Sequence, residues 1–203
     1  MPTYLRKYFI MGSQNCHRDP RDILQEAIEA GITAFQYREK GEGALTGKDK
    51  LNLGKDLRKI CLNNNIPFFI NDDSALIDVL NVDGIHVGQA DLPVEILREK
   101  YPNLLIGLSI SNKKELNNSR LELVDYIGAG PIYNTETKID AKEAVGTKWI
   151  EHLRKHYPNL PIVGIGGITT QNAKNVLYAG ANGVAVISVI TCAKDIKKVV
   201  EQL

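Results

Sequence analysis

Strand-like and helix-like segments alternate along the whole chain, and this alternation most constrains the fold. Eight short apolar runs are predicted as strands, and amphipathic segments lie between them. Strands separated by helices pair in parallel through right-handed crossovers. Eight such units in 203 residues favour a closed barrel over an open doubly wound sheet, because such barrels take roughly 200 residues or more. The sequence therefore predicts an α/β fold, a (β/α)8 TIM barrel with a parallel eight-stranded core and a single domain over residues 1–203. The predicted strands are Tyr8–Gly12, Ala34–Lys40, Pro67–Asn71, Gly84–Gly88, Leu105–Ser109, Tyr126–Ile132, Ile162–Ile168 and Gly183–Ile190.

The predicted helices carry signals at their ends. In Asp19–Gly31, Asp19 and Pro20 are typical of an N-cap and a first turn, and Gly31 is typical of a stop. In a barrel of this kind, function lies where strands end and the following loops begin. The residues at the strand ends are therefore the candidates for chemistry. The other predicted helices are Lys48–Asn64, Ser74–Asn81, Pro93–Tyr101, Lys113–Glu122, Thr147–Tyr157, Thr170–Gly180 and Ala193–Leu203.

Composition excludes several classes of partner. The 25 basic and 24 acidic residues leave a net charge of +1 without a basic block, so nucleic acid is not expected. No apolar run approaches the ~20 residues that span a bilayer, and the N-terminus lacks a signal-peptide pattern. The three cysteines, Cys16, Cys61 and Cys192, form no CxxC motif and cannot all pair. We expect a cytoplasmic protein that binds small molecules and no membrane, with a homo-oligomer left open.

The segment Asp125–Lys138, DYIGAGPIYNTETK, is predicted as a buried strand that runs into a polar loop. Its glycines allow the backbone to approach another group closely. The loop then offers two hydroxyls and an ammonium, from Thr135, Thr137 and Lys138. This pattern indicates a site for an anionic ligand.

The second predicted strand ends in a run of alternating character, FQYREK. With a period of two, Gln36, Arg38 and Lys40 share the face that points into the barrel, and Tyr37 lies on the face toward the helices. Glu39 also faces outward and would contribute its backbone. A buried arginine needs a partner, so we expect either an anionic ligand or an internal salt-bridge layer at this strand end.

Carboxylates follow the third and fourth predicted strands. Asp72 comes after Asn71, and Asp91 follows GIHVGQA. Two carboxylates at neighbouring strand ends can share Mg²⁺, which fills its remaining sites with water and phosphate oxygens. Aspartate is also common at helix N-caps, and Asp73 fits that reading. His86 has inward parity and could be either a core histidine or a ligand contact.

Glycine-rich ends of the seventh and eighth strands predict a phosphate site. GIGGIT at 164–169 precedes a helix, and GVAVIS at 183–188 adds backbone N–H groups around Ile187 and Ser188. The alternative is close packing of helix on strand. Together with the positive charges and carboxylates, this pattern suggests two substrates that are joined with loss of diphosphate.

The motifs FQYREKG, FFINDD, DGIHVGQAD, GLSIS, YIGAGPIYNTETK, VGIGGIT and GVAVIS, in this order, closely resemble those of the thiamin phosphate synthase family, over about residues 8–190. The resemblance implies joining of hydroxymethylpyrimidine diphosphate to hydroxyethylthiazole phosphate, by loss of diphosphate and attack of the thiazole nitrogen. It implies catalytic roles for Arg38, Ser109 and Lys138, and Mg²⁺ on Asp72 and Asp91. The pyrimidine diphosphate would be held by Gln36, Tyr37, Arg38, Glu39, Lys40, Asn71 and Ser109, and the thiazole phosphate by Thr135, Glu136, Thr137, Gly167, Ile187 and Ser188, with Lys138 on the departing diphosphate.

The chain departs from the family pattern at three positions. Asn134 stands where proline is common, Tyr37 where leucine is common, and Ala90 where an acidic residue is frequent beside Asp91. The first affects the rigidity of the segment Asn134–Val145, which is a candidate lid. The third weakens the negative field of the metal site without removing a proposed ligand.

Three other functions remain open from the sequence. The related thiazole tautomerase would need the phosphate site and an acid–base residue but not the diphosphate apparatus. A non-catalytic barrel would bind thiamin phosphate without turnover. A phosphosugar epimerase or isomerase would need carboxylates or histidines facing a ring carbon, and no such inward pair is evident.

Overall fold

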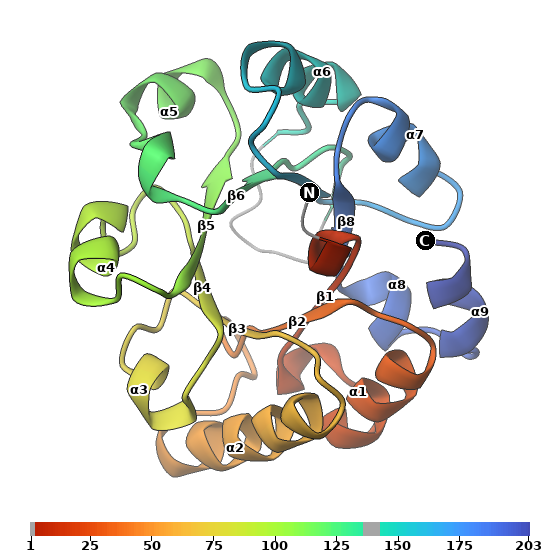
Figure 1. Ribbon diagram of the computed structural model, residues 1–203. Helices are drawn as coiled ribbons and strands as arrows, with labels where there is room; N and C mark the ends of the chain where they lie inside the picture. Colours follow the sequence, from red (N-terminus) through yellow and green to blue (C-terminus); the bar gives the residue numbers. More distant parts are fainter. Residues whose placement is uncertain (1–2, 136–142) are drawn as a thin grey trace.

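Parallel strands close into a barrel at the centre of the protein. The computed structural model describes residues 3–135 and 143–203, and in these residues β1 to β8 pair in sequence order, with β8 returning to β1. Figure 1 looks along this barrel and shows the helices as an outer ring. The predicted closed eight-stranded barrel is confirmed. The strands are β1 Lys7–Met11, β2 Ala34–Tyr37, β3 Phe68–Asn71, β4 Gly84–Val87, β5 Leu105–Ile110, β6 Tyr126–Ala129, β7 Ile162–Ile165 and β8 Gly183–Val186.

The helices form where the sequence gives start and stop signals. In the first, the Asp19 side chain accepts a hydrogen bond from the Arg21 N–H, Pro20 occupies the first turn, and Gly31 has a φ of 97°. No helix in residues 3–135 or 143–203 is long and apolar enough to cross a membrane. The helices are α1 Pro20–Glu29, α2 Gly47–Asn63, α3 Leu76–Leu80, α4 Val94–Lys100, α5 Lys113–Asn118, α6 Thr147–His156, α7 Ala173–Tyr178, α8 Ser188–Thr191 and α9 Ile196–Glu201.

Alternate residues of each strand serve two separate cores. Tyr8, Phe69 and Tyr126 belong to the cluster inside the barrel, whereas Phe35 and Tyr37 belong to the larger cluster under the helices. A short 3₁₀ turn, η1 Thr3–Leu5, closes the amino end of the barrel, because Leu5 is fully buried and Tyr4 stacks on Phe69. The open end is therefore the carboxyl end of the strands.

Four strands end at least three residues earlier than predicted. β2 stops at Tyr37 rather than Lys40, and the other three each have a local cause. β6 stops at Ala129, before Gly130 and Pro131, because proline lacks the N–H that a strand ladder needs. β7 stops at Ile165, before two glycines with positive φ. β8 stops at Val186, and the residues predicted to extend it form the short helix α8 instead. These early ends place three loops at the open end of the barrel.

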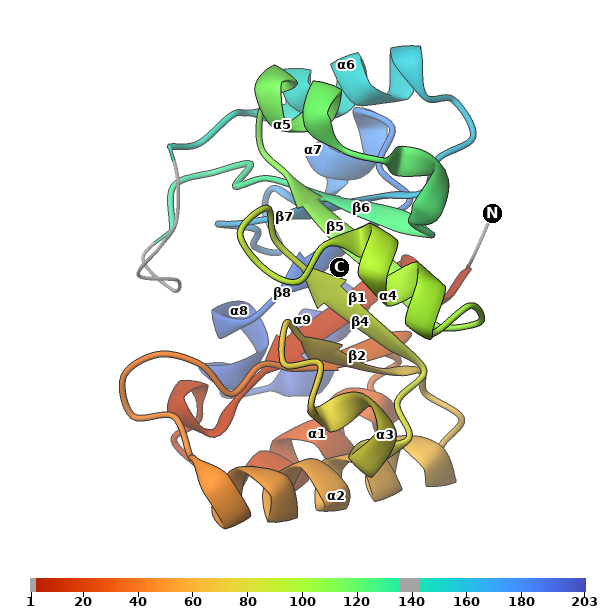
Figure 2. The ribbon, with the colours of Figure 1, turned by 90° about the vertical axis from the view of Figure 1, so that its left-hand side faces the viewer.

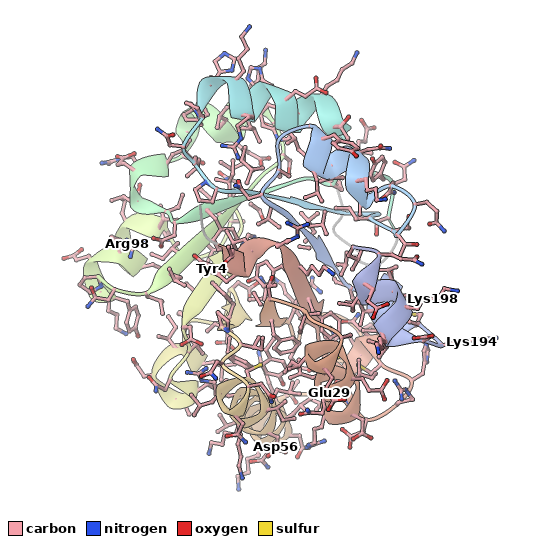
Figure 3. All side chains as sticks on the ribbon, turned by 45° about the vertical axis from the view of Figure 1, so that its right-hand side comes forward. Tyr4, Glu29, Asp56, Arg98, Lys194 and Lys198 are labelled. Carbon is pink, nitrogen blue, oxygen red and sulfur yellow. The ribbon has the colours of Figure 1, made fainter. Side chains whose placement is uncertain are left out.

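Arginines from three helices brace the amino end of the barrel. Arg58 of α2 pairs with Asp83, the residue directly before β4, and Arg98 of α4 pairs with Asp125, directly before β6. Arg154 of α6 donates to Asn182, directly before β8. Each of the three acceptors also takes a backbone N–H from the preceding strand, at Phe68, Ile106 and Ile162 respectively. The arrangement repeats at alternate strands and ties helix to sheet. Figure 3 labels Arg98 on α4.

We expect Arg98→Met to lower the free energy of unfolding by about 1.5–3 kcal/mol, because hydrogen bonds to charged groups contribute roughly that much. The guanidinium donates to the carbonyls of Pro102, Leu104 and Leu123 as well as to Asp125. Urea unfolding measures the change. Arg18→Met is the control, since Arg18 makes an exposed ion pair with Glu26, and exposed pairs contribute little. Equal stability of the two variants would contradict the bracing role.

Candidate active site

A pocket of about 450 Å³ opens at the carboxyl ends of the strands. Figure 2 shows, on its left, the loops that follow β2 and β6 and the helix α8, all at this end of the barrel. Residues of β5, β6, β7 and β8 line the pocket, together with residues of the segments that follow β2 and β4 to β8. Seven of the predicted site residues are among them: Lys40, Asp91, Ser109, Thr135, Gly167, Ile187 and Ser188.

The basic end of β2 lies beside the pocket. Gln36 is buried inside the barrel and Lys40 reaches the pocket surface, as the alternation predicts, and Arg38 between them is 7 % exposed. The Lys40 ammonium forms an ion pair with the Asp72 carboxylate. This hydrogen bond with Asp72 raises the pKa of Lys40, and the charge of Asp91 adds to the effect. Lys40 is thus held as a cation next to both predicted metal ligands.

Tyr37 and Glu39 are not among the residues that line the pocket, and the side chain of each makes its hydrogen bonds elsewhere. Tyr37 is buried under α2 and donates its hydroxyl to the Lys50 carbonyl at 2.9 Å. The Glu39 carboxylate accepts from the Ser13 N–H at 2.9 Å and from the Leu45 N–H at 2.7 Å. Glu39 therefore braces the loop after β1 against the loop before α2.

Asp72 and Asp91 have the chemistry of a weak magnesium site. No cluster of three or more metal-ligating side chains occurs in residues 3–135 and 143–203. Asp72 pairs with the Lys40 ammonium, and Lys40 and Asp91 line the same pocket, so the two carboxylates lie near a common space. One Asp91 oxygen accepts from the Gly88 N–H at 2.7 Å, which orients the carboxylate. Two carboxylates fit Mg²⁺ if water and a bound phosphate supply the other oxygens.

Asn71 ends β3 on its inner side, in register with His86 of β4. Asp73, which fitted an N-cap, instead pairs with Lys50 at 2.7 Å and accepts weakly from the Ala75 N–H at 3.3 Å. Neither observation brings Asp73 to the pocket. The N-cap of α3 is Ala75, so the N-cap prediction for Asp73 is wrong, and Asp73 acts through its ion pair with Lys50 instead.

The loop after β7 lines the pocket with backbone at two glycines. Gly166 and Gly167 have φ values of 96° and 63°, which favour glycine. Asn172 fixes the loop, because its side chain donates to the Gly167 carbonyl and accepts from the Thr169 N–H. Ile187, the N-cap of α8, follows the neighbouring strand β8 and also lines the pocket. Backbone N–H groups and a helix start at this position of a barrel suit a phosphate.

His86 contacts the site, which the sequence left undecided. Its ring lies between Ser109 of β5 and Tyr126 of β6, with hydrogen-bond distances of 2.8 and 3.0 Å. Gln89 was not predicted, yet it lines the pocket and donates to the Ser109 carbonyl at 2.8 Å. Inward parity was the signal for His86, while a loop residue such as Gln89 carries no such signal. Glu136, Thr137, Lys138 and the centre of the predicted lid Asn134–Val145 lie outside the described residues.

Comparisons with known proteins agree on one family. A family model described as thiamine monophosphate synthase matches residues 7–190. A thiamine-phosphate synthase of Oceanobacillus iheyensis is 61% identical over 98% of this chain and 97% of its own. One of Anoxybacillus flavithermus is 47% identical over 100% of this chain and 94% of its own.

Solved structures give the same result. A thiamine phosphate pyrophosphorylase from Pyrococcus furiosus superposes with a TM-score of 0.85 at 29% identity, covering 99% of this chain and 95% of that one. An N-(5'-phosphoribosyl)anthranilate isomerase from the same organism, at 15% identity and a TM-score of 0.66 over 97% of this chain and 96% of that one, shares the fold alone. The family model matches most of the barrel, and the relatives are similar to this chain along nearly its whole length. The chain therefore belongs to the thiamine monophosphate synthase family of enzymes.

Proposed function

We propose that the protein joins hydroxymethylpyrimidine diphosphate to hydroxyethylthiazole phosphate, giving thiamin phosphate and diphosphate, with Mg²⁺ required. The observation that carries the proposal is one pocket with two different anion sites. Lys40 and Asp91 line one part of the pocket, with Asp72 paired to Lys40 and Arg38 two residues before it, and the Gly166–Gly167 loop and the start of α8 line another part. A metal–diphosphate and a monophosphate match these two sites.

The proposed mechanism needs charge neutralisation and alignment rather than a strong base. The bond between the methylene carbon and the diphosphate oxygen breaks, the electron pair leaves with the diphosphate, and the thiazole nitrogen attacks the methylene. Arg38, Lys40 and Lys138 stabilise the negative charge that develops on the leaving oxygens. When bound to Asp72 and Asp91, Mg²⁺ would add a Lewis acid for those oxygens. The phosphate loop and Thr135 hold the thiazole phosphate so that its ring faces the methylene.

The rival functions leave part of the site without use. A thiazole tautomerase on this barrel would have no role for the charged side of the pocket around Lys40, Asp72 and Asp91. A binding protein would form no product from the two substrates. The decisive assay incubates the purified protein with both substrates and measures thiamin phosphate, with each substrate omitted in turn. Thiamin phosphate that forms only when both substrates are present supports the proposal. Conversion of a thiazole tautomer without formation of thiamin phosphate supports the tautomerase.

We expect Gly167→Ala to raise the KM for the thiazole phosphate by about tenfold or more, with a smaller change in KM for the pyrimidine diphosphate. A Cβ at this position would lie 2.5 Å from the Asn134 carbonyl oxygen and 2.8 Å from Tyr133 Cβ, so the loop must shift. Steady-state kinetics with each substrate varied gives both constants. Gly31→Ala is the control, because Gly31 also has positive φ but a Cβ there meets nothing within 4 Å. An unchanged KM in Gly167→Ala would exclude the loop as the phosphate site.

A further inference from the structure

Five polar side chains form a continuous hydrogen-bonded chain across the inside of the barrel. The Gln36 amide nitrogen lies 2.9 Å from the Tyr8 hydroxyl, which lies 3.0 Å from the Tyr126 hydroxyl. Tyr126 is 3.0 Å from His86 Nδ1, and His86 Nε2 is 2.8 Å from the Ser109 hydroxyl. The chain begins in the fully buried interior and ends at Ser109, which lines the pocket. The proposed reaction gives no role to its three middle members.

Two glycines in neighbouring strands make room for this chain. A Cβ at Gly107 would lie 2.2 Å from Tyr126 Cζ and 2.5 Å from His86 Nδ1. A Cβ at Gly128 would lie 2.9 Å from His86 Cε1. The two rings also pack against each other, with centroids 5.5 Å apart. The strands are therefore shaped to hold His86 and Tyr126 in one arrangement.

The direction of every hydrogen bond follows from the first. An amide nitrogen can donate but not accept, so Tyr8 accepts from Gln36. No acceptor other than Tyr126 contacts the Tyr8 hydroxyl in the described part of the chain, and a buried donor left without an acceptor loses its full hydration free energy. Tyr8 therefore donates to Tyr126, and Tyr126 donates to His86 Nδ1.

The same direction continues to the pocket. With Nδ1 accepting, the neutral imidazole carries its proton on Nε2 and donates it to the Ser109 oxygen. The Ser109 proton is then left to point into the pocket. If the Gln36 amide presented its oxygen to Tyr8, every bond would reverse, and Ser109 would give its proton to His86. Burial raises the pKa of both Tyr8 and Tyr126, so each phenol keeps the proton that this order requires.

We propose that Tyr8, Tyr126 and His86 are positioning residues, which hold Ser109 as a hydrogen-bond donor toward an acceptor nitrogen of the substrate's pyrimidine ring. The identity of the substrate in this proposal rests on the proposed function. The order of the hydrogen bonds rests on the protein alone. The two can therefore be tested separately.

The first test is the tautomer of His86 in the ligand-free protein. The chain has 4 histidines, so ¹⁵N-labelled histidine gives a simple long-range ¹H–¹⁵N spectrum, and loss of one set of signals in His86→Asn assigns His86. We expect a neutral ring with the proton on Nε2. We expect Tyr126→Phe to give a mixture of tautomers, and Tyr101→Phe, which removes an exposed hydroxyl bound to Asp78, to leave the spectrum unchanged. A wild-type proton on Nδ1 would overturn the proposal whatever the enzyme's activity, and so would an unchanged spectrum in a folded Tyr126→Phe.

The second test is a double-variant cycle on the reaction. We expect Tyr126→Phe to lower kcat/KM for the pyrimidine diphosphate about tenfold, as loss of one oriented hydrogen bond would. Because Tyr126 acts through Ser109, the pair Tyr126→Phe with Ser109→Ala should lose no more than Ser109→Ala alone. Losses that multiply would show that Tyr126 is merely structural. If the wild type makes no thiamin phosphate, the proposed function fails and the tautomer measurement still decides the positioning role.

Discussion

Arg38→Ala is expected to lower turnover by about 10²–10³-fold, the usual loss when one preorganised donor to a developing negative charge is removed. Arg38 is 7 % exposed and lies next to Lys40, at the side of the pocket assigned to the diphosphate. A buried side chain loses little conformational freedom when the charge on the leaving group develops. Lys138→Ala should lose a similar factor if, as in the family it resembles, Lys138 contacts the departing diphosphate. Single-turnover kinetics with both substrates measures the chemical step directly.

Two control variants distinguish loss of catalysis from loss of folding. Arg38→Lys retains the charge but loses the bidentate geometry, so it should fall between the wild type and Arg38→Ala. Lys148→Ala, which removes an exposed lysine outside the pocket, should have no effect. Unchanged turnover in Arg38→Ala, with a normal unfolding transition, would remove Arg38 from the mechanism.

Asp91→Asn is expected to raise the Mg²⁺ concentration needed for half-maximal activity by about tenfold or more, because a carboxylate ligand of a hard cation becomes a neutral one. The amide oxygen can still accept from the Gly88 N–H, so the loop should keep its shape. Asp72→Asn should behave similarly, and asparagine tolerates the φ of 47° at this position. Removal of Mg²⁺ with a chelator should abolish turnover in the wild type.

The matched control for these carboxylates is Asp56→Asn. Asp56 lies on α2 and pairs with Arg21 at 2.7 Å, and Figure 3 places it on the outside of the protein. Its variant should keep the wild-type Mg²⁺ requirement. An unchanged requirement in both Asp72→Asn and Asp91→Asn would mean that the ion binds elsewhere or through the substrates alone.

The parts of the fold that depend on periodicity could be predicted. Alternation with a period of two placed Gln36 inside the barrel and Tyr37 outside it, and the order of strands and helices predicted closure. The helix α8 could not be predicted, because Val189 and Ile190 extend the apolar pattern of β8. What ends the strand is the backbone at Ile187, with φ −122° and ψ −84°, which an apolar sequence does not reveal.

Contacts between strands were the hardest part of the site to predict. Inward parity was visible for His86, Ser109 could be placed at the end of its strand, and Tyr126 could be placed at the beginning of its strand. Which of these side chains meet depends on the stagger of neighbouring strands, which sets Ser109 opposite Gly128 and His86 opposite Gly107. The resemblance to a family supplied roles for Tyr37 and Glu39, but strand geometry directs their side chains away from the pocket. A motif thus located the site, and the registers of the strands decided which of its side chains can act there.

The most direct test of the account follows diphosphate and thiamin phosphate together while Mg²⁺ is titrated into wild type and Arg38→Ala. We predict equal amounts of the two products, no release of diphosphate without Mg²⁺, and a rate in Arg38→Ala that stays about 10²-fold or more lower at saturating Mg²⁺. Thiamin phosphate formed at the full rate without Mg²⁺ would contradict the central claim that positive charge at the open end of the barrel draws the diphosphate away. A full rate in Arg38→Ala would contradict it equally.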